Sequence, residues 1–184
     1  MCIRDRPYNI EVVYRWDAAQ SYSSLSEVQL VPVEFDAVQP MMAALRDVWF
    51  KPYIQATGNS LDFLKEVAPK KIVLVGSPEY QNGSFKLGQA EGGRKILLLN
   101  VNNFDASNEN ELKEALHTIV HEFTHILHQT KLFNQEYQTI STGRYNSNWT
   151  LLNDSEARHQ GFITNYAMLN KDEDFAEMVS GILL

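Results

Sequence analysis

Apolar residues recur at helical spacing in four stretches of the chain and form shorter, partly alternating runs between them. The helical stretches are Asp36–Gln55, Ser60–Val67, Glu109–Thr130 and Asp172–Leu184. The strand-like runs are rich in Val, Ile, Leu, Tyr and Phe, and they are Tyr8–Trp16, Val28–Phe35, Lys71–Gly76, Phe85–Ala90 and Lys95–Val101. These elements predict an α+β fold, with a mixed or antiparallel sheet packed on the central helix Glu109–Thr130 and a smaller helical C-terminal part.

Prolines and glycines set the expected boundaries in the first half of the chain. Pro40 suits the first turn of the first long helix, and Pro52 is expected to kink or end that helix. Turns at Asn82-Gly83 and Glu91–Gly93 are expected to join the three following strands into a meander.

Polar residues mark the elements of the second half. Asn108 followed by Glu111 predicts a capping box at the start of the central helix. Thr139–Ser155 is a long loop of Thr, Ser, Asn and Gly, of the kind that often covers a binding site. A short helix is expected at Ser155–Gln160, and an extended segment at Phe162–Tyr166.

Length and charge narrow the class of protein. The 184 residues suit a single domain, which we assign to residues 7–184. Residues 1–6 are expected to be non-native, and both ends of the chain are expected to be truncated. A net charge of −7 without any basic run argues against nucleic-acid binding, and no apolar run reaches membrane-spanning length.

The central helix carries the sequence His-Glu-x-x-His, formed by His121, Glu122 and His125. Residues four apart lie on one face of a helix, so the two imidazoles can converge on one tetrahedral ion. Glu122 is turned partly off that face, where its carboxylate can act as a general base on a metal-held water. We expect this site to bind Zn²⁺.

Two other histidines on the same helix offer alternative pairs. His117 and His121 have the same spacing, but Thr118 stands where the base should be. His128 lies three residues after His125, again with no acid beside the first histidine. The pair His121 and His125 is therefore favoured, and the roles of His117 and His128 stay open.

Zinc hydrolases use three protein ligands, so a third must come from further along the chain. Lys131 stands where a metzincin has its third histidine, which excludes that pattern. The best candidate is Glu173, with Glu177 one helical turn later able to orient a ligating histidine. Competing ligands are Asp154, Glu156 and His159.

The motif followed by a Glu-x-x-x-Glu pair resembles the gluzincins, which include thermolysin-like and lethal-factor-like peptidases. The resemblance implies a zincin-like fold, Glu173 as ligand and Glu177 as its neighbour in support of a histidine. In lethal-factor-like enzymes a tyrosine seven residues before the ligand helps to stabilise the transition state. Tyr166 occupies that position here.

A closer resemblance covers nearly the whole chain after about residue 7. It rests on four stretches, which are Lys-Ile-Val-Leu-Val-Gly-Ser-Pro78, Ala-Glu-Gly-Gly93, the helix from His117 to Gln129, and Gly161–Ala167 with Glu173–Glu177. These stretches are similar to the substrate import-associated zinc metallohydrolase lipoproteins. That resemblance implies a cell-envelope location, as an outer-membrane lipoprotein or in the periplasm, and partners among outer-membrane nutrient importers. The sequence departs from the family in lacking a lipoprotein signal.

The expected function is therefore zinc-dependent hydrolysis of a peptide or protein substrate. Glu122 would activate the water and pass its proton to the leaving amine, and either Tyr166 or a displaced histidine would donate to the oxyanion. The run Ile96–Val101 is expected to be the sheet edge beside the site, where an extended peptide could add as a strand. The alternatives are a metal-containing protein that binds peptides or glycans without cutting them, and a helix with purely structural histidines.

Overall fold

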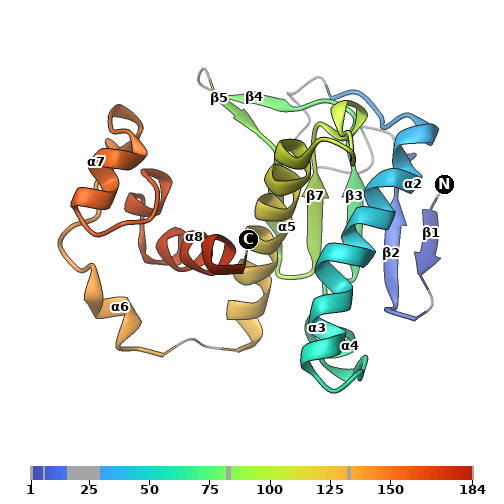
Figure 1. Ribbon diagram of the computed structural model, residues 1–184, viewed down its shortest axis with the longest axis horizontal. Coiled ribbons are helices and arrows are strands. Elements are labelled where there is room, and N and C mark those ends of the chain that lie inside the picture. Colours follow the sequence, from blue (N-terminus) through green and yellow to red (C-terminus); the bar gives the residue numbers. More distant parts are fainter. Residues whose placement is uncertain (1, 6, 16–29, 82–83, 132–133, 184) are drawn as a thin grey trace.

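The computed structural model describes residues 2–5, 7–15, 30–81, 84–131 and 134–183 (Figure 1). Within these ranges one mixed sheet has five strands in the order β1-β2-β3-β7-β6. The strands are β1 (Cys2–Asp5), β2 (Ile10–Val13), β3 (Lys71–Leu74), β7 (Lys95–Leu98) and β6 (Gly88–Glu91). β2, β3 and β7 run parallel to one another, whereas β1 and β6 are antiparallel to their neighbours.

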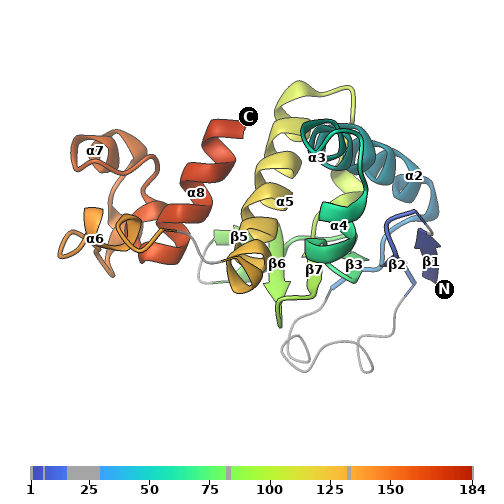
Figure 2. The ribbon, with the colours of Figure 1, turned by 90° about the horizontal axis from the view of Figure 1, so that it is seen from below.

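Helices cover one face of this sheet, as seen along the strands in Figure 2. Because side chains alternate along a strand, Ile72 and Leu74 pack with Ile96 and Leu98 in the large core shared with the helices. The residues between them, such as Val73 and Leu97, are buried in a small cluster that does not include helical residues. The central strands are therefore apolar on both faces, as their sequences indicate.

The first long helix has the predicted extent but not the predicted break. It consists of α2 (Phe35–Ala44), a π-helical segment η1 (Leu45–Phe50) and α3 (Lys51–Ala56). Pro40 lies inside α2, so its expected place in the first turn is wrong. The helix continues past Pro52 after a π turn in which the N–H of Lys51 donates to the carbonyl of Arg46, five residues back. Pro52 then lies at the start of α3, where its missing N–H is tolerated.

Two of the predicted strands do not form as expected. Within Val28–Phe35, residues 28 and 29 lie outside the described ranges, and Pro32 forms only a single bridge with Val75 before α2 begins. A proline lacks the N–H that would extend a ladder. The expected strand Phe85–Ala90 is divided between β5 (Ser84–Lys86), which pairs with β4 (Glu79–Gln81), and β6.

The predicted three-stranded meander does not form, because β3 and β7 pair in parallel and β6 lies on the outer side of β7. The edge strand beside the site is consequently β6, and the expected edge at Ile96–Val101 lies in the interior of the sheet. The β4–β5 hairpin leaves the sheet above α5 in the view of Figure 1.

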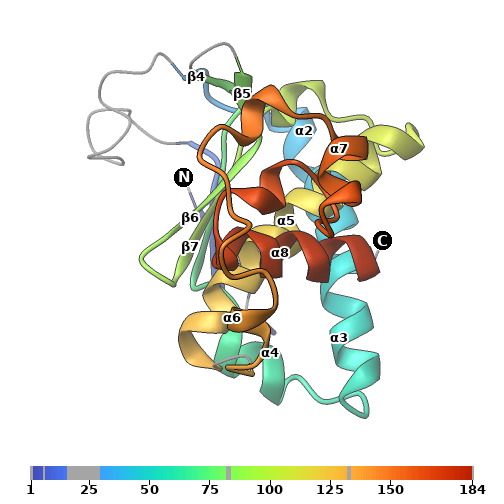
Figure 3. The ribbon, with the colours of Figure 1, turned by 90° about the vertical axis from the view of Figure 1, so that its left-hand side faces the viewer.

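The C-terminal part is helical, as predicted; it stands beside α5 in Figure 1 and lies in front of α5 in the view of Figure 3. After α4 (Asp62–Val67), η2 (Val101–Asn103) and α5 (Glu109–Thr130) come α6 (Tyr137–Ile140), η3 (Trp149–Leu151), α7 (Asp154–His159), η4 (Tyr166–Met168) and α8 (Lys171–Leu183). The expected extended segment Phe162–Tyr166 is wrong, since its residues form bends and then enter η4. α8 packs against α5 and brings the end of the chain to the motif helix. None of the described helices is both long and apolar enough to cross a membrane.

Candidate metal centre

Helix α5 begins and ends where the sequence predicts. Its cap differs in detail from a capping box, because the Asn108 side chain accepts from the N–H of Asn110 rather than of Glu111. Glu111 instead accepts from the Asn108 side chain and from the N–H of Asp105. The start of α5 is thus tied to the preceding turn.

The two faces of α5 are sharply different. The face toward the sheet and the first long helix is buried, and it carries Leu116, Ile119, Val120, Phe123 and Ile126. The ring of Phe123 meets the rings of Trp49 and Tyr53 edge-on, with centroids 5.2 and 5.4 Å apart. This packing directs His121 and His125 to the opposite face, toward α8.

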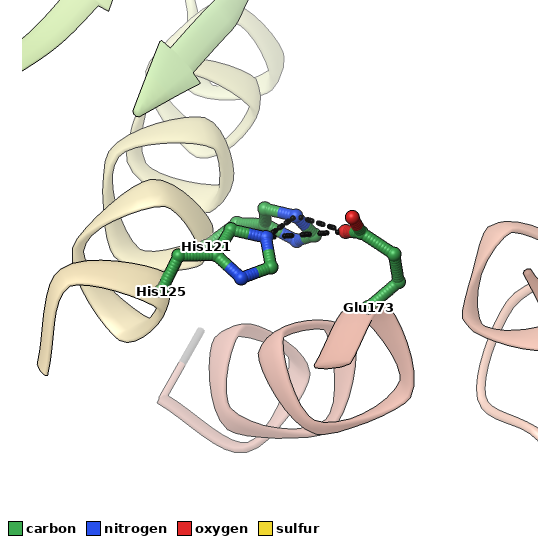
Figure 4. A group of neighbouring side chains, drawn as sticks. All are labelled: His121, His125 and Glu173. Atoms are coloured by element: carbon green, nitrogen blue, oxygen red, sulfur yellow. Dashed lines mark hydrogen bonds and ion pairs between the residues drawn. The ribbon is translucent and has the colours of Figure 1, made fainter. Parts of the chain in front are cut away.

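Three donor atoms from α5 and α8 converge at this face (Figure 4). The Nε2 atom of His121 lies 3.0 Å from Oε2 of Glu173 and 3.1 Å from Nε2 of His125. The third side of the triangle, from His125 Nε2 to Glu173 Oε2, is 3.2 Å. The first turn of α8, where Asn170 accepts from the N–H of Glu173, therefore supplies the third donor that α5 lacks.

The donors fit a zinc ion. Tetrahedral zinc with ligands at about 2.0–2.2 Å places neighbouring ligand atoms about 3.3–3.6 Å apart, so the observed triangle needs to open by only a few tenths of an ångström. Two imidazoles and one carboxylate are a donor set of catalytic zinc sites, which leave a fourth position for water or substrate. No other group of at least three such side chains with converging atoms occurs among the described residues.

The electrostatics of the metal-free triad show what an ion would replace. Burial lowers the pKa of His121, but the hydrogen bond with Glu173 and the close carboxylate of Glu177 outweigh burial and raise it to about 9. Burial raises the pKa of Glu173, but the bonds with His121 and His125 outweigh it and lower the pKa to about 2. Zinc binding must therefore displace a proton from His121, because a ligating imidazole has to be neutral.

Glu177 supports His121 from behind. Its Oε1 lies 2.9 Å from His121 Nδ1, although off the direction of the ring N–H, and 3.5 Å from His117 Nε2. Its Oε2 accepts from the hydroxyl of Thr164 at 2.8 Å. Burial raises the pKa of Glu177, but these partners outweigh burial and hold the pKa well below its usual range. His117, which also contacts Ser180 Oγ at 3.1 Å, is therefore placed behind the donor set and not in it.

Glu122 lies beside the donors and is attached to the edge of the sheet. Its Oε2 accepts from the backbone N–H of Ala90 in β6 at 2.5 Å. Burial raises the pKa of Glu122, and the nearby His121 and His125 only partly oppose that rise. The carboxylate is thus near the triad without belonging to it.

Tyr166 closes the site on the side of the C-terminal part. Its ring stacks on the ring of His121 with centroids 5.8 Å apart, and Trp149 meets it edge-on at 4.9 Å. Burial and the nearby acids, chiefly Glu173, raise the pKa of Tyr166 well above its usual range. The hydroxyl therefore stays protonated and remains a hydrogen-bond donor.

The competing ligand candidates have structural contacts elsewhere. Glu156 forms a capping box with Asn153 at the start of α7, and Asp154 accepts from the N–H of Asn165. His159 Nδ1 lies 2.7 Å from the carbonyl of Ser155 within the same helix. On α5, His128 lies at the end of the site and pairs loosely with Asp172 at 3.7 Å.

A cleft runs along β6 past the triad. It consists of two hollows of about 490 and 440 Å³ that share four lining residues, which are Lys86, His121, Glu122 and Tyr166. Lys86 could not be singled out from the sequence, because a lysine in a strand-like run is ordinary. Thr164 was likewise missed, since only the fold brings it to Glu177.

The fold and the donor set describe an α+β protein in which two histidines and one glutamate lie where they could hold a zinc ion. A family model described as "Putative zinc-binding metallo-peptidase" matches residues 4–184. The chain belongs to this family of zinc-binding metallopeptidases. The family resemblance expected from the sequence is thereby confirmed at the level of a zinc metallopeptidase, while its import-associated and lipoprotein features stay predictions.

A solved structure extends the comparison. A crystal structure titled as a putative zinc-binding metallo-peptidase from Bacteroides caccae is similar, with 35% sequence identity and a TM-score of 0.73. The similarity covers 95% of this chain and 66% of that chain, so the stretch described here spans about two thirds of its relative. None of the curated proteins compared with the chain matches it.

Proposed function

We propose that the protein is a zinc-dependent peptidase with a zincin-like arrangement of the gluzincin type. The observation that carries this proposal is the juxtaposition of the triad with Glu122. Three donors lie within 3.2 Å of one another, and a buried carboxylate that is not part of the triad stands next to them. A purely structural metal site has no need of that additional carboxylate.

Zinc, when bound, supplies a Lewis acid that polarises a carbonyl and lowers the pKa of water. Glu122 is the group that accepts a proton from the attacking water and returns it to the leaving amine. Its raised pKa favours this work, because a base is most effective when its pKa approaches the working pH. Tyr166, with its hydroxyl kept protonated, donates to the oxygen that becomes negative.

The edge strand β6 offers a place for an extended peptide. Leu87, Gln89 and Glu91 face β7, as the register and the bond from Leu99 N–H to the Leu87 carbonyl require. The backbone N–H and C=O groups of Gly88 and Ala90 therefore point to the open side, toward the cleft. An extended segment can pair with these groups, which favours a peptide as substrate.

Substitution Glu122→Gln tests the proposal. The variant is expected to bind zinc with unchanged stoichiometry and to lose cleavage of a peptide library that the wild-type protein cuts. Removal of zinc with a chelator is expected to abolish the wild-type activity, and added zinc to restore it. Full activity of the variant would contradict the assigned role of Glu122, and zinc-loaded protein that binds peptides without any turnover would favour the binding-protein alternative. The envelope location and the importer partners stay predictions from the sequence resemblance.

A further inference from the structure

We propose that Lys86 binds a carboxylate of the substrate next to the scissile bond and so makes the protein selective for peptides that carry a carboxylate at that place. This inference rests on the proposed function, because it assigns the specificity of the same cleft. The carboxylate has two possible sources, an acidic side chain or the C-terminus of the substrate itself.

Lys86 has a central place in the cleft. It is the last residue of β5, two residues before Gly88 begins the edge strand. It lines both hollows, together with His121, Glu122 and Tyr166. No other lysine or arginine lines either hollow, so Lys86 is the cation that a bound substrate would meet in the described part of the cleft.

The acids of the cleft have partners of their own. Glu173 and Glu177 are held by histidines, Glu122 by the N–H of Ala90, and Asp172 lies near His128. Lys86 has no carboxylate within 4.0 Å among the described residues, although it is partly shielded from solvent. An ammonium group at a reaction site without a counter-ion favours a ligand that brings one.

One internal acid has to be considered as a rival partner. Glu79 lies directly across the β4–β5 hairpin from Lys86, and it is buried with an Oε2 atom that lacks a hydrogen-bond partner. Cross-strand neighbours of opposite charge often pair. Here they do not, and Lys86 lines the cleft instead. A role confined to the hairpin would therefore show itself in stability and not in the choice of peptide.

The position of Lys86 also indicates which part of the substrate it meets. β6 runs from Gly88 toward Glu91, so a peptide added antiparallel to it places its C-terminal side over Gly88 and toward Lys86. The carboxylate is then expected on the residue that follows the scissile bond, or at the chain end shortly after it. Both sources lie on the same side of the bond.

Binding is measured first, so that the test does not depend on turnover. Zinc-loaded Glu122→Gln protein is titrated with acetylated, amidated hexapeptides of alanine in which one glutamate occupies each position in turn. Peptides with glutamine at the same positions are the neutral match, and hexa-alanine with a free or an amidated C-terminus separates the two sources. At one position at least, or with the free C-terminus, the acid is expected to bind about tenfold or more tightly, because a charge-assisted bond is lost in the neutral match.

Variants at position 86 assign the effect. Lys86→Met is expected to abolish the preference, Lys86→Arg to keep it, and Lys86→Glu to shift it toward lysine peptides. Lys113→Met is the matched control, since Lys113 is exposed on α5, pairs with Glu109 and does not line the cleft. Equal binding of acidic and neutral peptides by the parent protein, or a preference that survives Lys86→Met, would overturn the proposal. A lower melting temperature of Lys86→Met without a change in preference would overturn it in favour of the hairpin role.

Cleavage then separates this inference from the proposed function. Lys86 also favours the ionised form of Glu122, so its loss in Lys86→Met would slow the cleavage of all peptides by the same factor. Carboxylate binding predicts in addition that Lys86→Met lowers kcat/KM more for the peptides that carry the carboxylate than for their neutral matches. Peptide binding that depends on Lys86, without any cleavage, would refute the peptidase and leave the binding site standing. Cleavage that depends on Glu122 but shows no preference for a carboxylate would refute the binding role of Lys86 and leave the peptidase standing.

Discussion

The carboxylate of Glu122 accepts a hydrogen bond from the backbone N–H of Ala90, with 2.5 Å between the two atoms. This bond joins the motif helix to the open edge of the sheet, and it uses a donor that an added peptide strand would also use. The proposed base and the proposed peptide-binding edge are therefore connected directly by a hydrogen bond. A peptide that enters the cleft competes for the N–H that holds the base.

The close approach of β6 to α5 depends on Gly88. A side chain at this position would collide with Cγ2 of Thr118 and approach Cγ of Glu122 to 3.3 Å. Gly88→Ala is expected to push the edge strand away from α5 and to lower kcat about tenfold or more, because small misplacements of a catalytic group are costly. Zinc stoichiometry should stay unchanged, since none of the three donors contacts this glycine.

Thr118→Ser provides the control for that prediction. It removes the methyl group that the new Cβ would meet and leaves the hydroxyl, which bonds to the carbonyl of Glu114. The double variant is expected to regain part of the lost kcat, whereas Thr118→Ser alone should have little effect. Full activity of Gly88→Ala would show that the strand spacing is not needed.

The pH dependence of zinc binding follows from His121. Without metal its pKa is raised from 6.5 to about 9, so the protonated histidine stabilises the fold below pH 6.5 and this stabilisation is lost as pH rises to about 9. Zinc replaces the proton, so its affinity should increase with pH over the same interval. We expect the melting temperature of zinc-free protein to fall between pH 6.5 and 9, and the increase caused by zinc to grow.

Calorimetry checks the same point directly. Zinc titrations at pH 7.5 in buffers of different ionisation enthalpy should show about one proton released per ion from this site. His159→Gln is the matched control, because His159 is exposed on α7 and contacts only the local backbone. Zinc affinity that does not change between pH 6.5 and 9 would contradict the assigned proton.

The motif helix could be predicted almost completely from the sequence, and the reasons are local. Its apolar stripe and its end residues depend on neighbours three or four positions away, so the bounds Glu109 and Thr130 follow from the pattern. The choice of Glu173 as third donor used the four-residue spacing of Glu173 and Glu177 within one predicted helix, together with the resemblance to the gluzincins. Its contact with His121 and His125 joins two elements, and the spacing alone does not show it.

Relations between distant elements could not be predicted in this way. The parallel pairing of β3 and β7 depends on where the chain goes after the β4–β5 hairpin, and strand composition does not encode that path. The edge strand was predicted wrongly for this reason. Lys86 could not be identified from the sequence, because only the position of β6 brings it to the cleft. Thr164 could not be identified for the same reason, since its role depends on a hydrogen bond to Glu177, thirteen residues further along the chain.

Glu177 is expected to control zinc affinity through His121. Glu177→Gln leaves the donors in place but removes the charge behind the imidazole, and losses of support of this kind typically weaken metal binding about 10–100-fold. Competition with a chromophoric chelator measures the change. Thr164→Val, which removes only the hydroxyl bonded to the same carboxylate, should have a smaller effect in the same direction. An unchanged zinc affinity in Glu177→Gln would mean that the imidazole is oriented by packing alone.

Tyr166→Phe separates a catalytic role of the hydroxyl from a structural one. The ring contacts with His121 and Trp149 are kept, so the fold should be preserved while the donor to the oxyanion is lost. We expect kcat to fall about 10²–10³-fold with little change in KM, as for other oxyanion donors. The hydroxyl also interacts with Glu173. If its main role were to hold that ligand in place, Tyr166→Phe would lower the zinc affinity instead of kcat. Trp149→Phe, which loosens the ring of Tyr166 but keeps its hydroxyl, is expected to reduce kcat far less.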